Sequence, residues 1–343
     1  MTAAVRFDKV DIVFGDSPET ALPLMDAGQD RAAIQAATGQ VLGVHDCSLE
    51  VAEGEILVLM GLSGSGKSTL LRAVNALNPV ARGRVEIRRG DRMVDITHAD
   101  PATLREMRLN QIAMVFQQFG LLPWRSVAEN VGLGLELGGM PRRDRAARVA
   151  RQLELVHLSD WADRRVGELS GGMQQRVGLA RAFVTEAPIL LMDEPFSALD
   201  PLIRTRLQDE LLQLQRELRR TIIFVSHDLD EAFKLGNRIA IMEGGRIVQC
   251  GTPRQIFSAP ANDYVAEFVA HMNPLGVLTA EDVMEPATTA GGTGMDAATP
   301  VAEVMQALRV AAAPLPVIRD GQCIGQVSPA GVLARLAATG TSG

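Results

Sequence analysis

The chain has 343 residues, a net charge of −7 and an apolar share of 47%, which is typical of a soluble globular protein with a main domain and a smaller one. The negative charge argues against a protein that binds nucleic acid non-specifically. No apolar run approaches the ~20 residues that a membrane-spanning helix requires, and the N-terminus lacks the apolar core of a signal peptide. We therefore expect a cytoplasmic protein.

Three scattered cysteines, Cys47, Cys250 and Cys323, have neither the number of a disulfide framework nor the spacing of a metal site. We therefore expect each cysteine to be a small, buried hydrophobic residue. The five histidines do not cluster either, so no metal centre built from histidine and cysteine is expected.

The first part of the chain predicts strands that a helical segment interrupts. Residues Val5–Phe14 alternate partly between apolar and polar and predict an edge strand of an antiparallel region. Residues 17–39 have helical spacing, which predicts a helical insertion outside the sheet. A strand resumes at Val41–Val51, and a turn leads from it into a buried strand at Glu55–Met60.

A phosphate-binding pattern follows this buried strand. Residues 61–69, GLSGSGKST, fit G-x-x-x-x-G-K-[ST], and Thr69–Leu77 predicts the helix that the pattern needs. Glycines let backbone N–H groups point at phosphate, Lys67 reaches the β and γ oxygens, and Ser68 can hold Mg²⁺. The alternative is a glycine-rich turn with a solvated lysine. Because strand, loop and helix agree, we favour a nucleotide site formed by Gly61, Ser63, Gly64, Ser65, Gly66, Lys67, Ser68 and Thr69.

The middle of the chain continues with strands and a helical block. Residues 83–87 and 93–96 predict a hairpin, and Ile112–Phe116 predicts a buried strand that ends at Gln117. Residues 126–166 are strongly helical, which places a helical block between strands of the sheet.

Two further strands end at residues with reactive side chains. Ile189–Met192 leads to Asp193 and Glu194, and Thr221–Val225 leads to His227. Because successive side chains of a strand point to opposite sides, one carboxylate can reach Mg²⁺ while the other faces the attacking water. The alternative for the two acids is capping of the next turn. Strands that alternate with helices predict an α/β sheet with a ligand site along one edge.

A second glycine-rich element, LSGGMQQR at residues 169–176, opens a helix. Its serine and glycines at a helix N-terminus can bind an anion by the same backbone argument as the first loop. A plain N-cap with flexible glycines fits these residues as well. The candidate binding residues are Ser170, Gly171, Gly172 and Met173.

Beyond residue 273 the composition shifts to Ala, Thr, Gly and Pro, which predicts a linker over 274–299. Residues 300–343 predict a small unit of two helices and two strands. About forty residues rarely hold a stable core alone, so we expect this unit to pack on a partner copy or on the main domain.

The ordered set of motifs resembles that of the ATP-binding-cassette ATPases. The phosphate loop is followed by VFQ (115–117), LSGGMQQR, ILLMDEP, SALD (197–200) and SHD (226–228) in that family's order. The resemblance covers roughly Val5–Asn273 and implies a nucleotide-binding domain at 1–273, with a mixed sheet, an antiparallel edge and a helical subdomain at about 120–183. It also implies a head-to-tail homodimer, in which ATP lies between the phosphate loop of one copy and LSGGM of the other.

The same resemblance implies roles for the metal and phosphate ligands. Lys67, Ser68 and Thr69 hold phosphate and Mg²⁺. Gln117 ligates Mg²⁺ and senses the transporter. Asp193 supports the metal.

The resemblance also implies roles for the residues around the γ-phosphate and the adenine ring. Glu194 is the general base and His227 the γ-phosphate contact. Asp200, from SALD, belongs to the ATP-binding set. Phe14 matches the position of an aromatic ring that stacks on adenine, although the insertion after Asp16 departs from the family's usual short loop.

Two segments resemble one group within this family, the ATPase subunits of importers. The loop after Gln117 resembles that of importers, and the insertion at 17–39 with the segment after it is similar to ATPase subunits of glycine betaine, proline and choline uptake systems, most closely the choline type. This implies two membrane permease subunits, an extracytoplasmic solute-binding protein and a location on the cytoplasmic face of the inner membrane. Residues 298–338 look like one CBS (cystathionine-β-synthase-like) module. Gly331 stands where modules that bind adenosyl ligands often have aspartate, so a structural dimerisation role or no role fits equally well.

The leading hypothesis is thus an ATPase that powers import of a quaternary-ammonium solute. The solute never touches this chain, so its identity rests on the resemblance alone. The alternative is a soluble ATP-binding-cassette switch acting on ribosomes or DNA, but the paired cassettes or long coiled coils of such proteins do not appear here. Intact Lys67 and Glu194 argue against a binding-only regulatory module, and a GTPase would need an N-K-x-D element.

Overall fold

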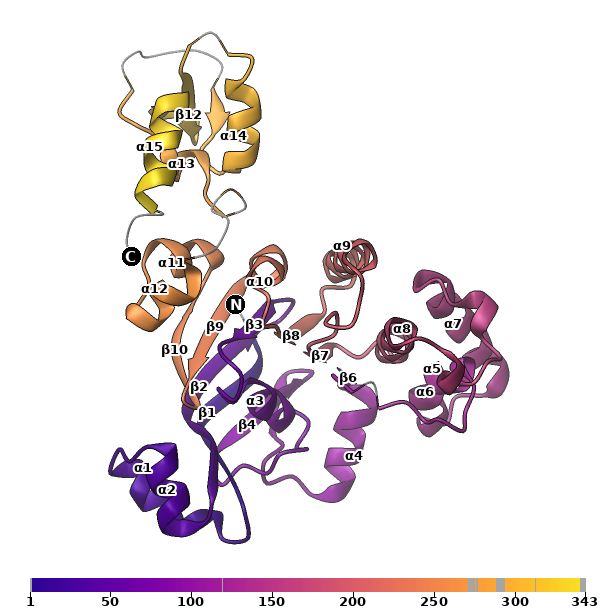
Figure 1. The fold of residues 1–343 in the computed structure, drawn as a ribbon. Helices are drawn as coiled ribbons and strands as arrows, with labels where there is room; N and C mark the ends of the chain where they lie inside the picture. Colours follow the sequence, from indigo (N-terminus) through magenta and orange to yellow (C-terminus); the bar gives the residue numbers. More distant parts are fainter. Residues whose placement is uncertain are drawn as a thin grey trace. The chain divides into compact units, whose positions relative to one another are not determined.

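The computed structural model describes residues 2–118, 120–270, 275, 277–287, 294–311 and 313–339. By its internal contacts the chain divides into two compact units, residues 1–227 with 240–248 and residues 228–239 with 249–343. Figure 1 traces the elements of both units along the chain. Within the described ranges, no helix has the length and apolar character that crossing a bilayer requires.

The first unit begins with an antiparallel sheet in the strand order β2-β1-β4-β5. Its strands are β1 (Ala3–Phe14), β2 (Val41–Ala52), β4 (Arg82–Arg89) and β5 (Arg92–Asp95). Because Val5 pairs with both Val51 and Ile87, β1 lies inside the sheet. The prediction of an edge strand at Val5–Phe14 is therefore wrong. Strand neighbours depend on contacts with distant residues, which alternation along one strand does not encode.

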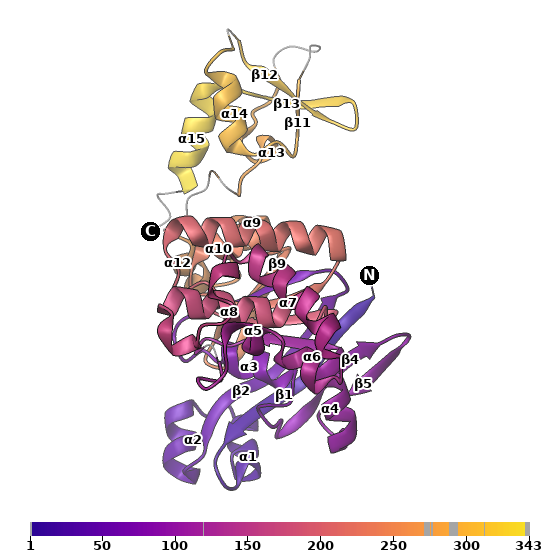
Figure 2. The same ribbon diagram turned by 90° about the vertical axis from the view of Figure 1, so that its right-hand side faces the viewer.

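The insertion at 17–39 is helical, as predicted, and lies beyond one end of β1 and β2 (Figures 1 and 2). It holds a short 3₁₀ turn (Pro18–Thr20), α1 (Leu22–Asp26) and α2 (Arg31–Thr38). Asp30 caps α2 by accepting a hydrogen bond from the Ala33 N–H (2.8 Å), and Gly39 ends the helix in the left-handed conformation. The apolar residues of the insertion share a small core with the sheet. This core consists of Val13, Ala21, Met25, Ile34 and Leu42.

A second sheet carries the strands with reactive ends, in the order β10-β9-β3-β8-β7-β6. The parallel strands are β3 (Ile56–Met60), β8 (Thr221–Val225), β7 (Ile189–Asp193) and β6 (Ile112–Val115). Three of these, β3, β7 and β8, are buried at every residue, as expected for parallel strands covered on both faces. The hairpin of β9 (Arg238–Glu243) and β10 (Arg246–Gly251) completes the sheet.

Helices connect and cover these strands. Helix α3 (Lys67–Ala73) follows β3 and is shorter than the predicted Thr69–Leu77, and α4 (Pro101–Asn110) precedes β6. The helical block consists of α5 (Val127–Val131), α6 (Leu133–Leu137), α7 (Arg142–Leu155) and α8 (Gly171–Phe183), and Figure 2 shows these helices side by side. They share a core that runs from Val127 to Val184. Helix α9 (Pro201–Leu218) links β7 to β8.

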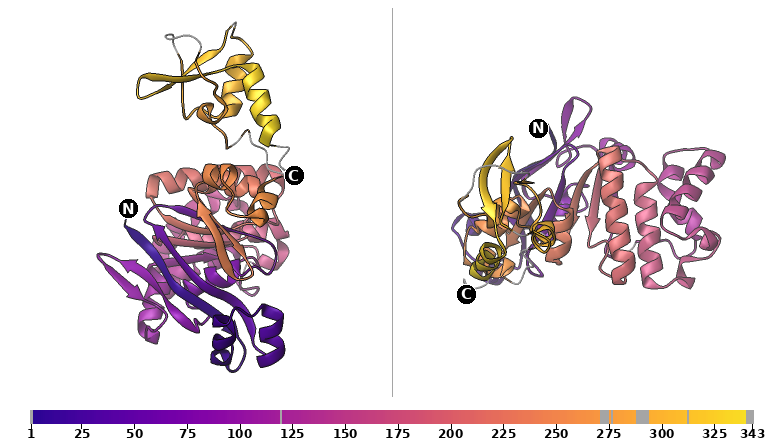
Figure 3. Two further views of the ribbon diagram at one scale, coloured as in Figure 1. Left: turned by 90° about the vertical axis from the view of Figure 1, so that its left-hand side faces the viewer. Right: turned by 90° about the horizontal axis from the view of Figure 1, so that it is seen from above.

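The second unit ends in a small sheet of its own, in the order β11-β12-β13. Its strands are β11 (Met295–Asp296), β12 (Leu315–Arg319) and β13 (Gln322–Val327). Helices α14 (Val301–Leu308) and α15 (Pro329–Thr339) cover one face of this sheet (Figures 2 and 3). The unit also contains α10 (Leu229–Leu235), α11 (Pro253–Ser258), α12 (Asp263–Val269) and α13 (Ala280–Val283).

The predicted linker at 274–299 is wrong where the structure describes it. Leu278, Val283 and Ala297 are buried in the core of the small unit together with Val301 and Val317. A few apolar side chains are enough to anchor this segment, although its average composition is that of a linker. Residues 271–274, 276 and 288–293 lie outside the described residues.

The cysteines occupy three different environments, so the prediction that all three are buried is correct only for Cys47. Cys47 is buried in β2, Cys250 is intermediate and Cys323 is exposed. Burial raises the pKa of the Cys47 thiol to about 12, which leaves little of the reactive thiolate at neutral pH.

We therefore expect Cys323 to react with a chromogenic disulfide reagent at pH 8 within minutes, whereas Cys47 reacts only after denaturation. Replacing each cysteine by serine in turn assigns the kinetic phases. Rapid reaction of Cys47 in the native protein would contradict the burial of its thiol.

Candidate functional site

The loop at residues 61–69 adopts a backbone that only glycine tolerates at two positions. Gly61 and Gly66 have φ of 138° and 100°. A Cβ at Gly61 would lie 2.1 Å from the Met242 carbonyl oxygen, and one at Gly66 would lie 2.6 Å from the Gly43 carbonyl oxygen. The glycines of the pattern are thus explained by close backbone approach, and they shape a cradle of the kind that binds phosphate.

Lys67 is held inside this loop. Its Nζ donates to the carbonyl oxygens of Gly61 and Leu62, both at 2.9 Å. Burial lowers the pKa of the ammonium, and the charges of Glu194 and Asp193 oppose that shift. The side chain is therefore a partly desolvated cation beside the cradle, where an anionic ligand would be a stronger partner than two neutral carbonyls.

Ser68 and Asp193 meet across the gap between α3 and β7. The Ser68 hydroxyl donates to Asp193 Oδ1 (2.6 Å), and Arg72 Nη2 donates to Oδ2 (2.8 Å). The described residues hold no group of three His, Cys, Asp or Glu side chains that could bind a metal ion. A hydroxyl and a carboxylate beside a phosphate cradle nevertheless fit Mg²⁺, which prefers oxygen and takes further ligands from phosphate and water.

Asp193 is fully buried, and Arg72 is the charged partner that compensates it. We expect Arg72→Met to lower the free energy of unfolding by about 2 kcal/mol, because the carboxylate would stay buried without its counter-charge. Urea unfolding measures the change. Arg89→Met, which breaks an exposed pair with Glu106, is the matched control and should cost less than about 1 kcal/mol. Equal losses in both variants would contradict a special role for the buried pair.

Three predicted residues from three strand ends meet at the Glu194 carboxylate. Gln117 Nε2 donates to Glu194 Oε2 (3.0 Å), and His227 Nδ1 lies 3.5 Å from the same oxygen. Glu194 has φ of 47°, which an L-residue rarely adopts, and its N–H donates to the Val225 carbonyl oxygen (3.2 Å). The side chain is 19% exposed, so water can reach a largely enclosed carboxylate.

Gln175 is a residue that the sequence analysis did not single out. It is almost fully buried in α8; its Nε2 donates to the Glu194 carbonyl oxygen and its Oε1 accepts from the Ala198 N–H, both at 3.2 Å. The only signal in the sequence is a polar side chain on the buried side of the helix. Gln175 connects the helix of the second glycine-rich element to the backbone of Glu194, so it helps to position that carboxylate.

The turn at Ser170–Met173 forms the N-terminus of α8, where Ser170 and Gly171 are exposed. Ser170 Oγ accepts from the Met173 N–H (3.4 Å), so the N-cap interpretation holds within one chain. A Cβ at Gly171 would meet nothing within 4 Å, whereas one at Gly172 would approach the Ala198 carbonyl oxygen. The turn therefore opens toward solvent and leaves room for a ligand or a second molecule.

Two other predicted binding residues lie at the edges of the site. Phe14 is 38% exposed, and its ring lies over Gly43, where an added Cβ would be 2.8 Å from Phe14 Cε2 and 3.0 Å from Thr69 Cγ2. Asp200 caps α9 by accepting from the Ile203 N–H (3.0 Å) and is exposed. Phe14 is thus next to the phosphate loop, and Asp200 has a structural role in its own chain.

Comparisons with known proteins agree with this geometry. A family model described as ABC transporter matches residues 44–197. The dimeric post-hydrolysis structure of the ATP-binding cassette MJ0796 with ADP and Pi is similar with a TM-score of 0.63 and 30% identity, covering 73% of this chain and 99% of that chain.

Curated relatives are more similar still. The glycine betaine/proline betaine transport system ATP-binding protein ProV of Salmonella typhimurium is 49% identical over 271 residues, 79% of this chain and 67% of ProV. The trimethylamine N-oxide transport system ATP-binding protein TmoW of Ruegeria pomeroyi is 43% identical over 322 residues, 94% of this chain and 93% of TmoW.

Proposed function

This chain belongs to the ATP-binding subunits of quaternary-amine ABC importers, and we propose that it works as a head-to-tail homodimer that hydrolyses ATP with Glu194 as the general base. The observation that carries the proposal is the meeting of Gln117 and His227 at the Glu194 carboxylate, next to the phosphate loop. A carboxylate that is largely enclosed, but still open to water, can accept the proton of an attacking water.

The residues around the cradle divide the remaining work. Lys67 leaves its two loop carbonyls for the phosphate oxygens, and Ser68, Gln117 and Asp193 would hold Mg²⁺. When bound, Mg²⁺ neutralises the charge of the phosphates. His227 orients the terminal phosphate, and Phe14 offers its exposed ring to adenine.

The second half of each site comes from the partner copy in this proposal. Ser170 and Gly171 are exposed at the N-terminus of α8, and this N-terminus suits the phosphates of a nucleotide bound to another chain. Asp200 joins the same interface. The similar cassette MJ0796 is described as a dimer with ADP and Pi, which supports this arrangement.

The class of solute is proposed from the names of the relatives that match this chain over the longest segments. These name glycine betaine, proline betaine, carnitine and trimethylamine N-oxide, and a shorter match also names choline; these solutes share a methylated, fully substituted nitrogen. They do not favour choline over the other solutes, so we extend the choline-type prediction to this class. The trimethylamine N-oxide relative also matches 94% of this chain, which makes that solute a candidate.

The proposed partners are two membrane permease subunits and an extracytoplasmic solute-binding protein. The proposed location is the cytoplasmic face of the inner membrane. Uptake of labelled glycine betaine, choline and trimethylamine N-oxide should be measured in cells that express this chain together with permease subunits and a solute-binding protein of a quaternary-amine importer. We expect uptake of at least one solute with the wild-type chain and none with Glu194→Gln. Uptake that persists in that variant would refute the coupling of this ATPase to import and favour the soluble-switch alternative.

We propose that residues 300–343 form a CBS-like unit and that its role is structural. A side chain at Gly331 would lie 3.1 Å from the Glu285 carboxyl carbon, and the Gly331 N–H donates to Ser328 Oγ (3.0 Å). An aspartate at this position would face another carboxylate, so the environment does not favour a nucleotide-binding acid here.

A further inference from the structure

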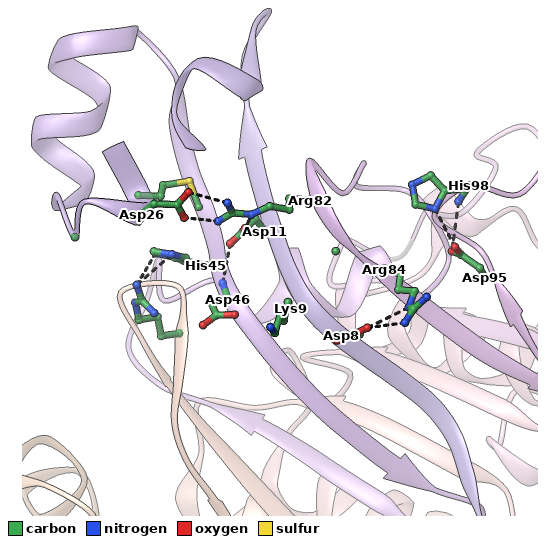
Figure 4. Close-up of a pocket in the computed structure, with 14 residues that line it drawn as sticks. Asp8, Lys9, Asp11, Asp26, His45, Asp46, Arg82, Arg84, Asp95 and His98 are labelled. Carbon is green, nitrogen blue, oxygen red and sulfur yellow. Dashed lines mark hydrogen bonds and ion pairs between the residues drawn. The ribbon is translucent and has the colours of Figure 1, made fainter. Parts of the chain in front are cut away.

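The helical insertion is fastened to the antiparallel sheet by a charged bridge. Arg82 on β4 donates to the buried Asp11 on β1 (2.5 Å) and to Asp26 at the end of α1 (2.7 and 2.9 Å). Figure 4 shows the Arg82 guanidinium between these two carboxylates. Together with the small shared core, this bridge gives the insertion a fixed position on the sheet.

The other end of the insertion reaches the phosphate loop. Arg31, the first residue of α2, donates from Nη1 to the Gly64 carbonyl oxygen (2.5 Å) and from Nη2 to the Gly43 carbonyl oxygen (2.8 Å). Its Nε is buried without a hydrogen-bond partner. Both acceptors are neutral, so the guanidinium brings an uncompensated positive charge to the loop. Burial lowers its pKa, but the group remains protonated at neutral pH.

The contact with Gly64 completes a pattern in the loop. A backbone cradle for phosphate needs its N–H groups directed at the ligand, and therefore its carbonyls held elsewhere. The Ser65 carbonyl accepts from the Gly245 N–H (3.1 Å), and the Gly66 carbonyl accepts from the Leu70 N–H (2.8 Å). Gly64 is the loop residue whose carbonyl is held by a side chain of the insertion.

The contact between Arg31 and the Gly64 carbonyl matters more because Lys67 cannot hold the loop while it binds a phosphate. Lys67 holds the Gly61 and Leu62 carbonyls, but it must leave them to reach a phosphate. Arg31 donates from outside the loop, so its bond to Gly64 can persist when nucleotide is bound.

We infer that Arg31 is a positioning residue of the nucleotide site, through which the helical insertion holds the phosphate loop in its binding conformation. The inference rests on the proposed function, because it assumes that residues 61–69 bind ATP. Arg31 acts on affinity for any nucleotide with a β-phosphate, whereas Glu194 acts on the chemical step. The insertion is thus part of the nucleotide site rather than an appendage of the sheet.

The test compares Arg31→Ala, Arg31→Gln and Arg31→Lys with Asp26→Ala, which loosens the other end of the insertion without touching the loop. Titration with a fluorescent ADP analogue measures the Kd. We expect about a tenfold rise for Arg31→Ala and Arg31→Gln, which is the size expected when the loop loses its charged hydrogen bond to the Gly64 carbonyl. Arg31→Lys keeps the charge and should recover part of the affinity. Asp26→Ala should stay within about twofold of wild type.

A second readout separates positioning from chemistry. In steady-state hydrolysis, Arg31→Ala should raise KM for ATP and leave kcat unchanged at saturation. Thermal unfolding without nucleotide identifies a variant that fails to fold, in which case the Gln and Lys variants provide the comparison.

The outcomes are distinguishable. Wild-type affinity in Arg31→Gln, or an equal loss in Asp26→Ala, would overturn the role of Arg31. A wild-type chain that binds no nucleotide would instead overturn the proposed function.

Discussion

Glu194→Gln is expected to bind ATP with near wild-type affinity, to lose at least about a hundredfold in ATP turnover and to accumulate as an ATP-bound dimer. The amide keeps the size of the side chain, and it can still contact Gln117 and His227, the two partners of the carboxylate. It cannot accept a proton from water, so the nucleotide stays intact between the two copies. Phosphate release measures the turnover, and light scattering during gel filtration measures the mass with and without ATP.

Glu106→Gln is the control for this variant, because Glu106 pairs with Arg89 on the surface. It should hydrolyse ATP like the wild type. Near-normal hydrolysis by Glu194→Gln would refute the assignment of the general base. Loss of ATP binding together with turnover would show that Glu194 supports the site rather than the reaction.

Ser170→Arg is expected to abolish ATP-induced dimerisation while nucleotide binding to the monomer persists. In one chain, Ser170 only caps α8, and the turn around it opens to solvent. A long charged side chain there fills the space that the partner's nucleotide would occupy. Light scattering with ATP in the Glu194→Gln background measures the dimer. Titration of the same variant with the fluorescent ADP analogue measures nucleotide binding to the monomer.

Thr252→Arg is the matched control, because Thr252 is also an exposed N-cap and the substitution makes the same change of charge. Each loss of a cap should cost about 1 kcal/mol of stability. Only Ser170→Arg should block the dimer. If Ser170→Arg lost nucleotide binding and dimerisation equally, the LSGGM turn would have a structural role instead.

The parts of the site that lie within local motifs could be predicted from the sequence. The phosphate loop follows from glycine spacing between a buried strand and a helix. The sequence predicts Gln117, Glu194 and His227 at one sheet edge, because parallel strands bring their carboxyl ends together. The structure places Gln117 within hydrogen-bond distance of the Glu194 carboxylate and His227 within ion-pair distance of it. The α/β class follows from the same alternation of strands and helices.

Features that depend on contacts between distant residues could not be predicted. Strand β1 is interior because β4 returns to pair with it, and Leu278 and Ala297 are buried because they meet the helices and strands that follow. Arg31 reaches Gly64 across 33 positions of the chain, and Gln175 reaches Glu194 across 19. No spacing rule along the sequence encodes such tertiary hydrogen bonds.

The composite site is tested most directly by mixing two defective chains, Lys67→Ala and Ser170→Arg, each also carrying Glu194→Gln and a different fluorescent label. In a head-to-tail dimer, the intact phosphate loop of the Ser170→Arg chain meets the intact LSGGM turn of the Lys67→Ala chain. We predict ATP-dependent energy transfer in the mixture and none when either variant carries both labels. Equal signals in all three samples, or no signal in the mixture, would contradict a site shared between two copies.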